Sequence, residues 1–311
     1  MRRLALLCLA VLLIICGCEQ TPPQPKVTIP ETAPVSKPAA PATISAATGL
    51  FNQPQQPQLV ELSNHAIPGW RTDVQPPPAL VLFSYDPFLK PIDSSLNAAA
   101  LHLARSGSTA ELIQHGSINT AEPLILPNQT LTAAIDAGLI GKFYWIFPSK
   151  VPPQQLDLEH FRSQMREQLF MTDAEVDSLS LTDGVFTGSL RGIPFSAVHY
   201  QRLQKIAEPL LLHIDMSFFR GLYDNEIKSP LYQLIRQTAL SIGQLNLEPL
   251  VTSLSYSTLE GANSLDVRFM ISNLADLIKN PALLDAEMPA DWQIRNDALY
   301  AGDMYSEPKK M

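Results

Sequence analysis

A histidine, an aspartate and a serine alternate inside an apolar stretch of the chain. In "PLLLHIDMSFFRGL", residues 209 to 222, His213, Asp215 and Ser217 fall at every second position. Alternate side chains of an extended strand point to the same face, so these three polar groups would share one face. Imidazole and carboxylate groups act as general bases and as metal ligands. The stretch is therefore either a satisfied part of the core or a strand end that carries a reaction centre.

Each candidate also has a structural interpretation, and both interpretations stay open. Asp215 is either a ligand or base, or a cap for nearby backbone N–H groups. His213 lies inside an apolar run, where a histidine is either a ligand or a hydrogen-bonded member of the core. Ser217 has the same two possibilities. Asp86 stands directly before Pro87, a normal place for a turn residue, or it is a further ligand.

Short apolar runs and helical patterns alternate along the chain and would position these residues. Four runs predict strands buried on both faces: 79–84, 142–147, 209–215 and 249–255. Four signals predict helix starts: Asn128, the capping box Thr172 to Glu175, Ser229 with Pro230, and Ser264. The alternation predicts an α/β fold of three layers, α/β/α, with a mostly parallel central sheet. Ligands bind beyond the carboxyl ends of strands in such sheets.

The first residues form a separate segment. "MRRLALLCLAVLLIICGCEQ" has two arginines, an apolar run from Leu4 to Cys16, and then Gly17-Cys18. The run is shorter than the roughly 20 residues of a membrane-spanning helix. It predicts a secretory signal, and its end resembles a bacterial lipobox. Residues 1–17 would be removed and Cys18 would carry the lipid that anchors the chain to a membrane; an uncleaved anchor or an ordinary signal peptide is the alternative.

The composition of the mature chain excludes several classes of function. Cleavage before Cys18 leaves 20 basic and 30 acidic residues, a net charge of -10, which argues against a nucleic-acid partner. Cys8 and Cys16 are lost, so disulfides and cysteine-based zinc sites are excluded. Glu19 follows the anchor, and resemblance to Gram-negative lipoproteins predicts the outer membrane, facing the periplasm.

The remaining chain divides into two parts. Residues 18–46 hold seven prolines and no aromatic residue, which predicts an extended tether without a core. Residues 47–311 are interpreted as a single α/β domain. The sequence does not identify the small-molecule or envelope partner of this domain.

Six segments, in order, resemble the arginase and histone-deacetylase superfamily, especially its poorly characterised branch. The segments are "VELSNHAIPGW", "LVLFSYDPFL", "LTAAIDAGLIGKFYWIFP", "LLLHIDMSFF", "LVTSLSYSTLEG" and "NPALLDAEMPADWQIRNDALY". The resemblance implies an arginase-like fold. It also adds His65, in the first segment, and Glu260, in the fifth, to Asp215 and His213 as catalytic candidates.

The metal motifs of that family are reduced in this chain. Family enzymes use Asp-x-His-x-Asp and Asp-x-Asp-x-x-x-Asp motifs to hold one or two Mn or Zn ions that activate water. Here the first motif is Ser84 to Phe88, with Asp86 alone, and the companion of Asp215 is Ser217. Asp86, His213 and Asp215 would hold at most one divalent ion. Two functions follow: a binding or structural protein whose metal site is largely lost, or a hydrolase of C–N bonds with a mononuclear site.

Overall fold

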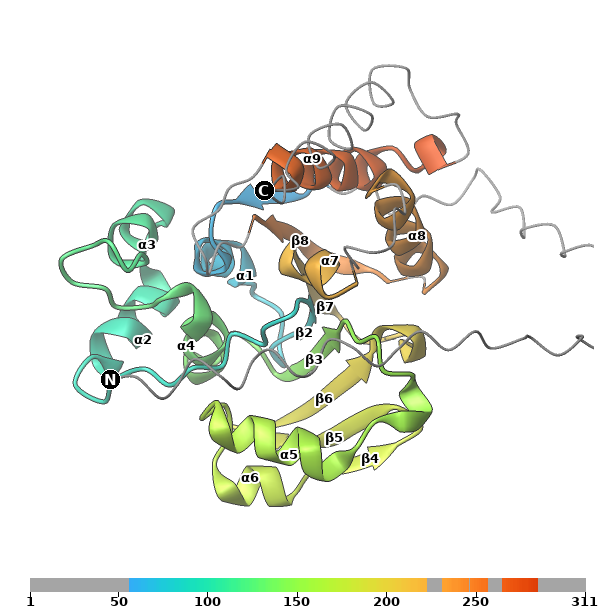
Figure 1. Cartoon of the computed structure of the whole chain (residues 1–311). Helices are drawn as coiled ribbons and strands as arrows, with labels where there is room; N and C mark the ends of the chain where they lie inside the picture. The colour runs from blue at the N-terminus through green and yellow to red at the C-terminus, as the bar shows by residue number, and fades with distance from the viewer. Residues whose placement is uncertain (1–55, 223–230, 246, 257–264, 285–311) are drawn as a thin grey trace, which may run out of the picture. The chain divides into compact units, whose positions relative to one another are not determined.

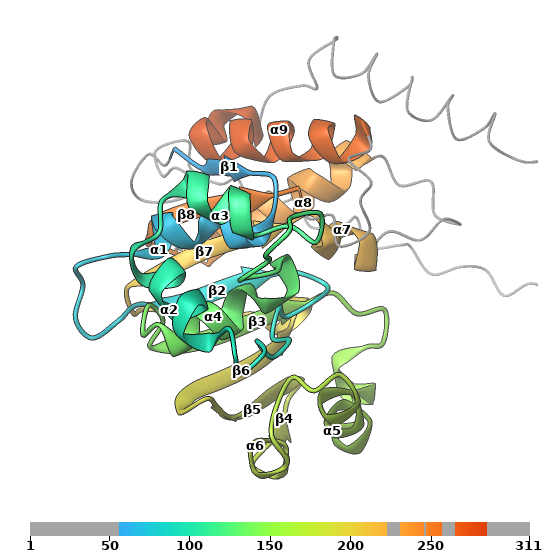
Figure 2. The same ribbon diagram turned by 90° about the vertical axis from the view of Figure 1, so that its left-hand side faces the viewer.

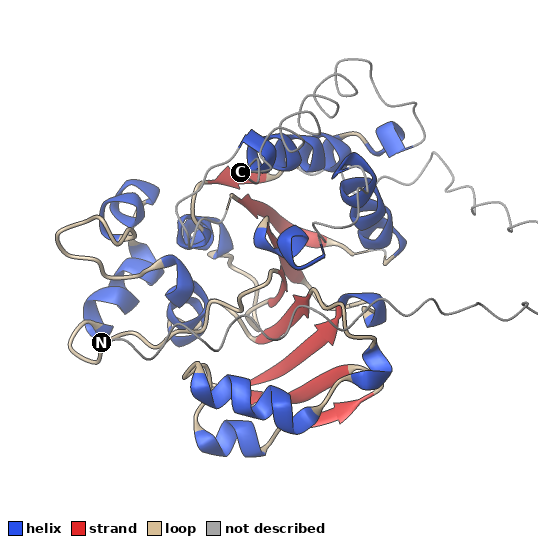
Figure 3. Ribbon diagram, in the orientation of Figure 1, coloured by secondary structure: helices blue, strands red, loops and turns tan. Residues whose placement is uncertain are grey.

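A single mixed sheet forms the centre of the domain. The computed structural model describes residues 56–222, 231–245, 247–256 and 265–284. Within this part, eight strands are joined in the order β1-β8-β7-β2-β3-β6-β5-β4. Figure 3 shows the strands in red. They are β1 (Gln58–Val60), β2 (Ala79–Phe83), β3 (Lys142–Phe147), β4 (Ser180–Thr182), β5 (Val185–Leu190), β6 (Ile193–His199), β7 (Leu210–Asp215) and β8 (Pro249–Ser255).

Most of the sheet is parallel, and an antiparallel meander extends one side. Strands β1, β8, β7, β2, β3 and β6 all run parallel to one another, whereas β5 pairs antiparallel with β6 and β4 pairs antiparallel with β5. Two-residue turns join the meander, Asp183-Gly184 and Arg191-Gly192, with φ of 49° and 80° and of 48° and 82°. Positive φ at both positions is typical of the turns whose twist matches that of a hairpin, and glycine adopts it without strain.

Helices pack on both faces of this sheet (Figures 1 and 2). One face carries α1 to α6 and the other carries α7 to α9, as the two clusters of buried side chains show. The helices are α1 (Ile67–Trp70), α2 (Asn97–Ser106), α3 (Thr109–His115), α4 (Thr130–Asp136), α5 (Leu158–Glu167), α6 (Asp173–Asp177), α7 (Ser217–Leu222), α8 (Leu231–Gln244) and α9 (Leu265–Lys279). Short 3-10 helices lie at Ser63–Ala66 (η1), Pro127–Gln129 (η2), Pro153–Gln155 (η3), Tyr200–Arg202 (η4) and Pro281–Leu284 (η5).

The central strand β2 shows why its sequence is apolar throughout. Leu80 and Leu82 point into the cluster under α1 to α6, while Val81 and Phe83 point into the cluster under α7 to α9. A strand covered on both faces must place an apolar side chain at every position. The predicted α/β class and the four predicted strands are confirmed, since β2, β3, β7 and β8 occupy those runs.

The predicted helix starts have mixed outcomes. The capping box is present at α6, where Thr172 and Glu175 each accept from the other's backbone N–H. The prediction for Asn128 is wrong: this residue lies within η2, and α4 begins after Gln129 without a side-chain cap. Ser229, Pro230 and Ser264 lie outside the described residues.

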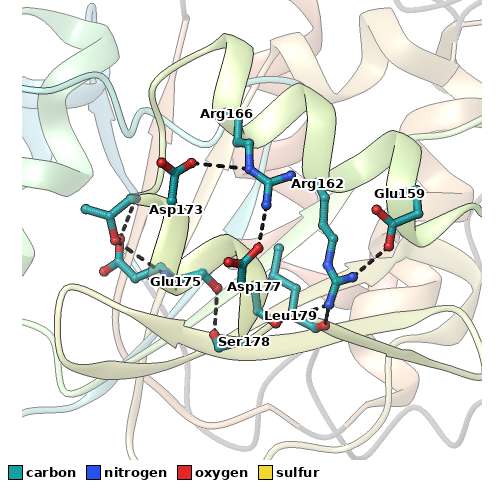
Figure 4. A network of polar contacts seen from close by, with 9 residues as sticks. Glu159, Arg162, Arg166, Asp173, Glu175, Asp177, Ser178 and Leu179 are labelled. Atoms are coloured by element: carbon teal, nitrogen blue, oxygen red, sulfur yellow. Dashed lines mark hydrogen bonds and ion pairs between the residues drawn. The ribbon is translucent and has the colours of Figure 1, made fainter.

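Two arginines of α5 link this helix to α6 and to Leu179, the residue directly before β4 (Figure 4). Arg162 pairs with Glu159 at 2.6 Å and donates to the backbone oxygens of Leu179 at 2.6 Å and Asp177 at 3.2 Å. Arg166 pairs with Asp173 at 3.3 Å and with the Asp177 carboxylate at 2.5 Å. We call these groups the α5–α6 ion-pair network.

Candidate functional site

The carboxyl ends of β7 and β8 place four polar side chains on one face of the sheet. In the parallel register, His213 is paired with Ser253 and Asp215 with Ser255. Neighbouring strands lie about 4.8 Å apart, and paired positions present their side chains to the same face. The alternation of His213 and Asp215 is therefore matched by an equal alternation of serines. All four residues are fully buried.

His213 is hydrogen-bonded at both ring nitrogens. Its Nδ1 lies 2.7 Å from Ser253 Oγ and its Nε2 lies 3.0 Å from Ser255 Oγ. The indole Nε1 of Trp70, at the end of α1, donates to Ser253 Oγ at 3.2 Å. The rings of Trp70 and His213 also meet edge to face, with centroids 5.3 Å apart. The imidazole is therefore held by hydroxyl groups and by an aromatic edge.

Burial sets the charge of this histidine. His213 has no solvent-exposed surface, and this burial lowers its pKa to about 3. The imidazole is neutral at physiological pH. A neutral ring with serine partners can lie in the core without the cost of an unpaired charge.

Asp215 ends β7 and organises the start of α7. One carboxylate oxygen, Oδ2, is bound by the hydroxyl of Ser255, and the other, Oδ1, accepts the backbone N–H of Ser217 at 2.9 Å. The hydroxyl of Ser217 in turn accepts the backbone N–H of Tyr85 at 3.1 Å. Asp215 thus caps the first backbone N–H of α7, and Ser217 connects the loop after β2 to the residues that follow β7.

Asp86 lies in that loop and also bonds to backbone. Its Oδ1 accepts the N–H of Phe88 at 2.6 Å, across a turn that leaves Phe88 with a φ of 56° and its ring buried. Burial raises the pKa of Asp86, while the Phe88 N–H and the charge of Lys90 act in the opposite direction. The side chain of the preceding residue, Tyr85, is 63% exposed beside this turn.

His65 follows β1 in η1, and its hydrogen bonding is incomplete. The side chain is buried, and Nε2 has no hydrogen-bond partner among the described residues. Burial lowers the pKa of His65, and Glu61 raises it by a smaller amount. An unpartnered buried polar atom costs stability, so this nitrogen has an unused hydrogen-bonding or metal-binding capacity.

The described residues do not fit the divalent metal site that the resemblance implies. No group of three or more His, Cys, Asp and Glu side chains among them is arranged to hold an ion. Both ring nitrogens of His213 are engaged by serines, and the carboxylates of Asp86 and Asp215 bind backbone N–H groups. Glu260 and the lipidation candidate Cys18 lie outside the described residues.

Sequence reasoning missed three members of this cluster: Trp70, Ser253 and Ser255. The signal was present, because "SLS" in β8 repeats the spacing of "HID" in β7. Only the strand order shows that the two segments are neighbours.

Comparison of the chain with protein-family models, with curated proteins and with solved structures finds no match. Of the helices that the structure describes, none combines the length and the apolar character needed to span a membrane.

Proposed function

We propose that this chain is a lipoprotein of the cell envelope, anchored through Cys18 to the outer membrane and facing the periplasm. Its domain, which we assign to the arginase and deacetylase type, serves a binding or structural role. The mostly parallel sheet with helices on both faces is compatible with that type. The anchoring part of the proposal is supported by the Ile15 to Cys18 pattern.

One observation carries the binding or structural role. His213 and Asp215, which a hydrolase would present to a metal or to water, are buried and tied to the hydroxyls of Ser253 and Ser255. Activation of water by a bound ion needs several ligands and an open coordination position. A histidine whose two ring nitrogens are both in hydrogen bonds has no free nitrogen to bind an ion.

Metal analysis of the purified chain tests this role. The full mature chain, isolated without chelator, is analysed for Mn and Zn beside the Asp215→Asn variant. We expect less than a tenth of an ion per chain in both. About one ion per wild-type chain that is lost in the variant would overturn the proposal.

Lipid attachment is tested separately. Cys18→Ala should abolish incorporation of labelled fatty acid and leave the chain unprocessed. Cys16→Ala is the matched control, because it changes a neighbouring thiol that the proposed cleavage removes. Unchanged labelling of Cys18→Ala would contradict the anchor.

His65 supports an alternative function, a metal-dependent hydrolase of C–N bonds with a mononuclear site. Its buried Nε2 lacks a partner among the described residues, and a metal ion or substrate would satisfy it. Glu260 is the second residue that the family resemblance adds as a catalytic candidate. Metal that is bound by the wild-type chain and lost in both His65→Gln and Glu260→Gln would favour this alternative.

A further inference from the structure

The partners around His213 restrict where its proton can lie. A neutral imidazole carries one N–H and one lone pair, and a hydroxyl donates one hydrogen while accepting others. The donor in one contact therefore determines which atom can donate in the next contact. Trp70 and Asp215, at the two ends of the cluster, fix the first donor and the last acceptor.

The Trp70 end allows only one direction. The indole N–H is a donor with no acceptor capacity, so Ser253 Oγ accepts at 3.2 Å. The hydroxyl hydrogen of Ser253 then has two possible acceptors, His213 Nδ1 at 2.7 Å and the backbone oxygen of Leu212 at 3.4 Å. The first distance is that of a good hydrogen bond and the second is long.

The Asp215 end points the same way. With Asp215 ionised, its carboxylate only accepts, and both oxygens then do so, from the backbone N–H of Ser217 and from the hydroxyl of Ser255. Ser255 has then used its hydrogen. At 3.0 Å from His213 Nε2, its oxygen must accept, because two lone pairs at that distance would repel. Nε2 therefore carries the proton.

We infer that the five side chains form a one-way hydrogen-bond chain, Trp70 to Ser253 to His213 to Ser255 to Asp215. In this chain His213 is the tautomer with its proton on Nε2. Every donor points toward the carboxylate, so each bond polarises the next and strengthens the last one. Trp70, Ser253 and Ser255 are positioning residues that orient His213 and Asp215.

The inference extends the proposed function and rests on it, because the proposed function gives His213 a role without a metal. The Nδ1 lone pair is taken by the Ser253 hydroxyl and Nε2 is protonated, so neither nitrogen can bind an ion without breaking this chain. A reversed chain, starting from a protonated Asp215, would place the proton on Nδ1 and send the Ser253 hydroxyl to the long contact with Leu212.

Nitrogen NMR of the full-length chain, labelled with ¹⁵N histidine in detergent, distinguishes the two directions. The His213 signals are assigned from their loss in His213→Gln. Long-range proton–nitrogen correlations at neutral pH should show a protonated Nε2 and an unprotonated Nδ1. A proton on Nδ1, or on both nitrogens, in the wild-type chain would overturn the inference.

Two matched variants test the positioning roles. Ser255→Ala removes the acceptor of Nε2–H, and the proton should move to Nδ1, which can then donate to Ser253. Ser253→Ala keeps that acceptor, and the proton should stay on Nε2. If the serines only fill space, the His213 proton will stay on the same nitrogen in both variants. A proton that moves to Nδ1 only in Ser253→Ala would also contradict the inferred direction.

Adding Zn²⁺ separates failure of this inference from failure of the proposed function. We expect the His213 nitrogen shifts to stay unchanged. If Nε2 is protonated without Zn²⁺ and the signals then move when Zn²⁺ is added, the hydrogen-bond direction is correct and the non-metal role is wrong. If the proton lies on Nδ1 and Zn²⁺ has no effect, the non-metal role stands and the hydrogen-bond direction is wrong.

Discussion

Two polar clusters of this domain use similar groups in opposite surroundings. The chain around His213 lies in the core, and its five members, Trp70, His213, Asp215, Ser253 and Ser255, are fully buried. The α5–α6 ion-pair network lies at the surface, where the side chains of Arg166, Asp173 and Asp177 are 38%, 88% and 69% exposed. Both clusters are drawn together by short hydrogen bonds.

Burial, more than distance, decides how much a polar contact contributes to stability. Removing one partner from a buried cluster leaves the others without water, at about 1 to 3 kcal/mol for each unsatisfied group. Removing one partner from an exposed ion pair leaves the other to be hydrated, and such pairs contribute about 0 to 1 kcal/mol. The neutral His213 should therefore matter more to stability than the charged Arg166.

The largest effect is expected for His213→Ala. The variant leaves a cavity beside Trp70 and removes the partners of Ser253 and Ser255, so we expect a loss of about 3 to 5 kcal/mol in the free energy of unfolding. Urea denaturation measures it. A loss below about 1 kcal/mol would mean that this buried cluster contributes no more to the free energy of unfolding than an exposed ion pair does.

Acid should weaken the buried cluster next. His213 has a pKa near its ordinary value of 6.5 when unfolded and about 3 when folded. Below pH 6.5 the unfolded chain binds more protons, so stability falls as the pH decreases. From pH 6.5 to pH 4 this histidine should remove about 3 kcal/mol.

The pH dependence needs a control, because burial also lowers the pKa of His65 and His199. His213→Gln retains those two residues, so the difference between its pH profile and that of the wild type isolates His213. Parallel profiles between pH 4 and 6.5 would contradict the expectation.

A smaller effect is expected for Asp215→Asn, about 1 to 2 kcal/mol. The amide oxygen of the variant can still cap Ser217, but the amide nitrogen then faces Ser255 and can only donate to its hydroxyl, so the charge-assisted hydrogen bond from Ser255 is lost. Thermal unfolding of the variant measures the loss. An unchanged midpoint would show that the charge of Asp215 contributes nothing to the fold.

The smallest effects should come from the α5–α6 ion-pair network and should still follow burial. Arg162→Ala removes donors to the Leu179 and Asp177 carbonyls from a side chain that is 22% exposed, and about 1 kcal/mol is expected. Arg166→Ala should cost less than about 0.5 kcal/mol. The reverse order, measured by urea denaturation, would show that burial does not rank these two arginines.

The central strands could be predicted from the sequence because the signal for each of them lies within its own residues. A strand covered on both faces needs an unbroken apolar run, and β2, β3, β7 and β8 have such runs. The meander is different: β4 is three residues long, and β5 alternates between buried and exposed positions, so neither has that pattern.

The polar cluster was only half visible from the sequence. The spacing of His213 and Asp215 placed both on one face, but their partners come from β8 and α1, which are far away along the chain. Hydrogen bonding of a buried histidine depends on which strand is its neighbour. Strand order is a long-range property that periodicity does not contain.

The pairing of β1 with β8 has a consequence for the order of folding. Gln58 is paired with Ser253, 195 positions later, and β8 lies between β1 and β7. As the chain is synthesised, β1 comes first among the described strands, but its sheet neighbour comes last. Contacts of such long separation form slowly, and until β8 inserts, β1 and β7 both expose open backbone edges. The domain can therefore neither join β1 to its sheet nor cover the edge of β7 before almost the whole chain is present.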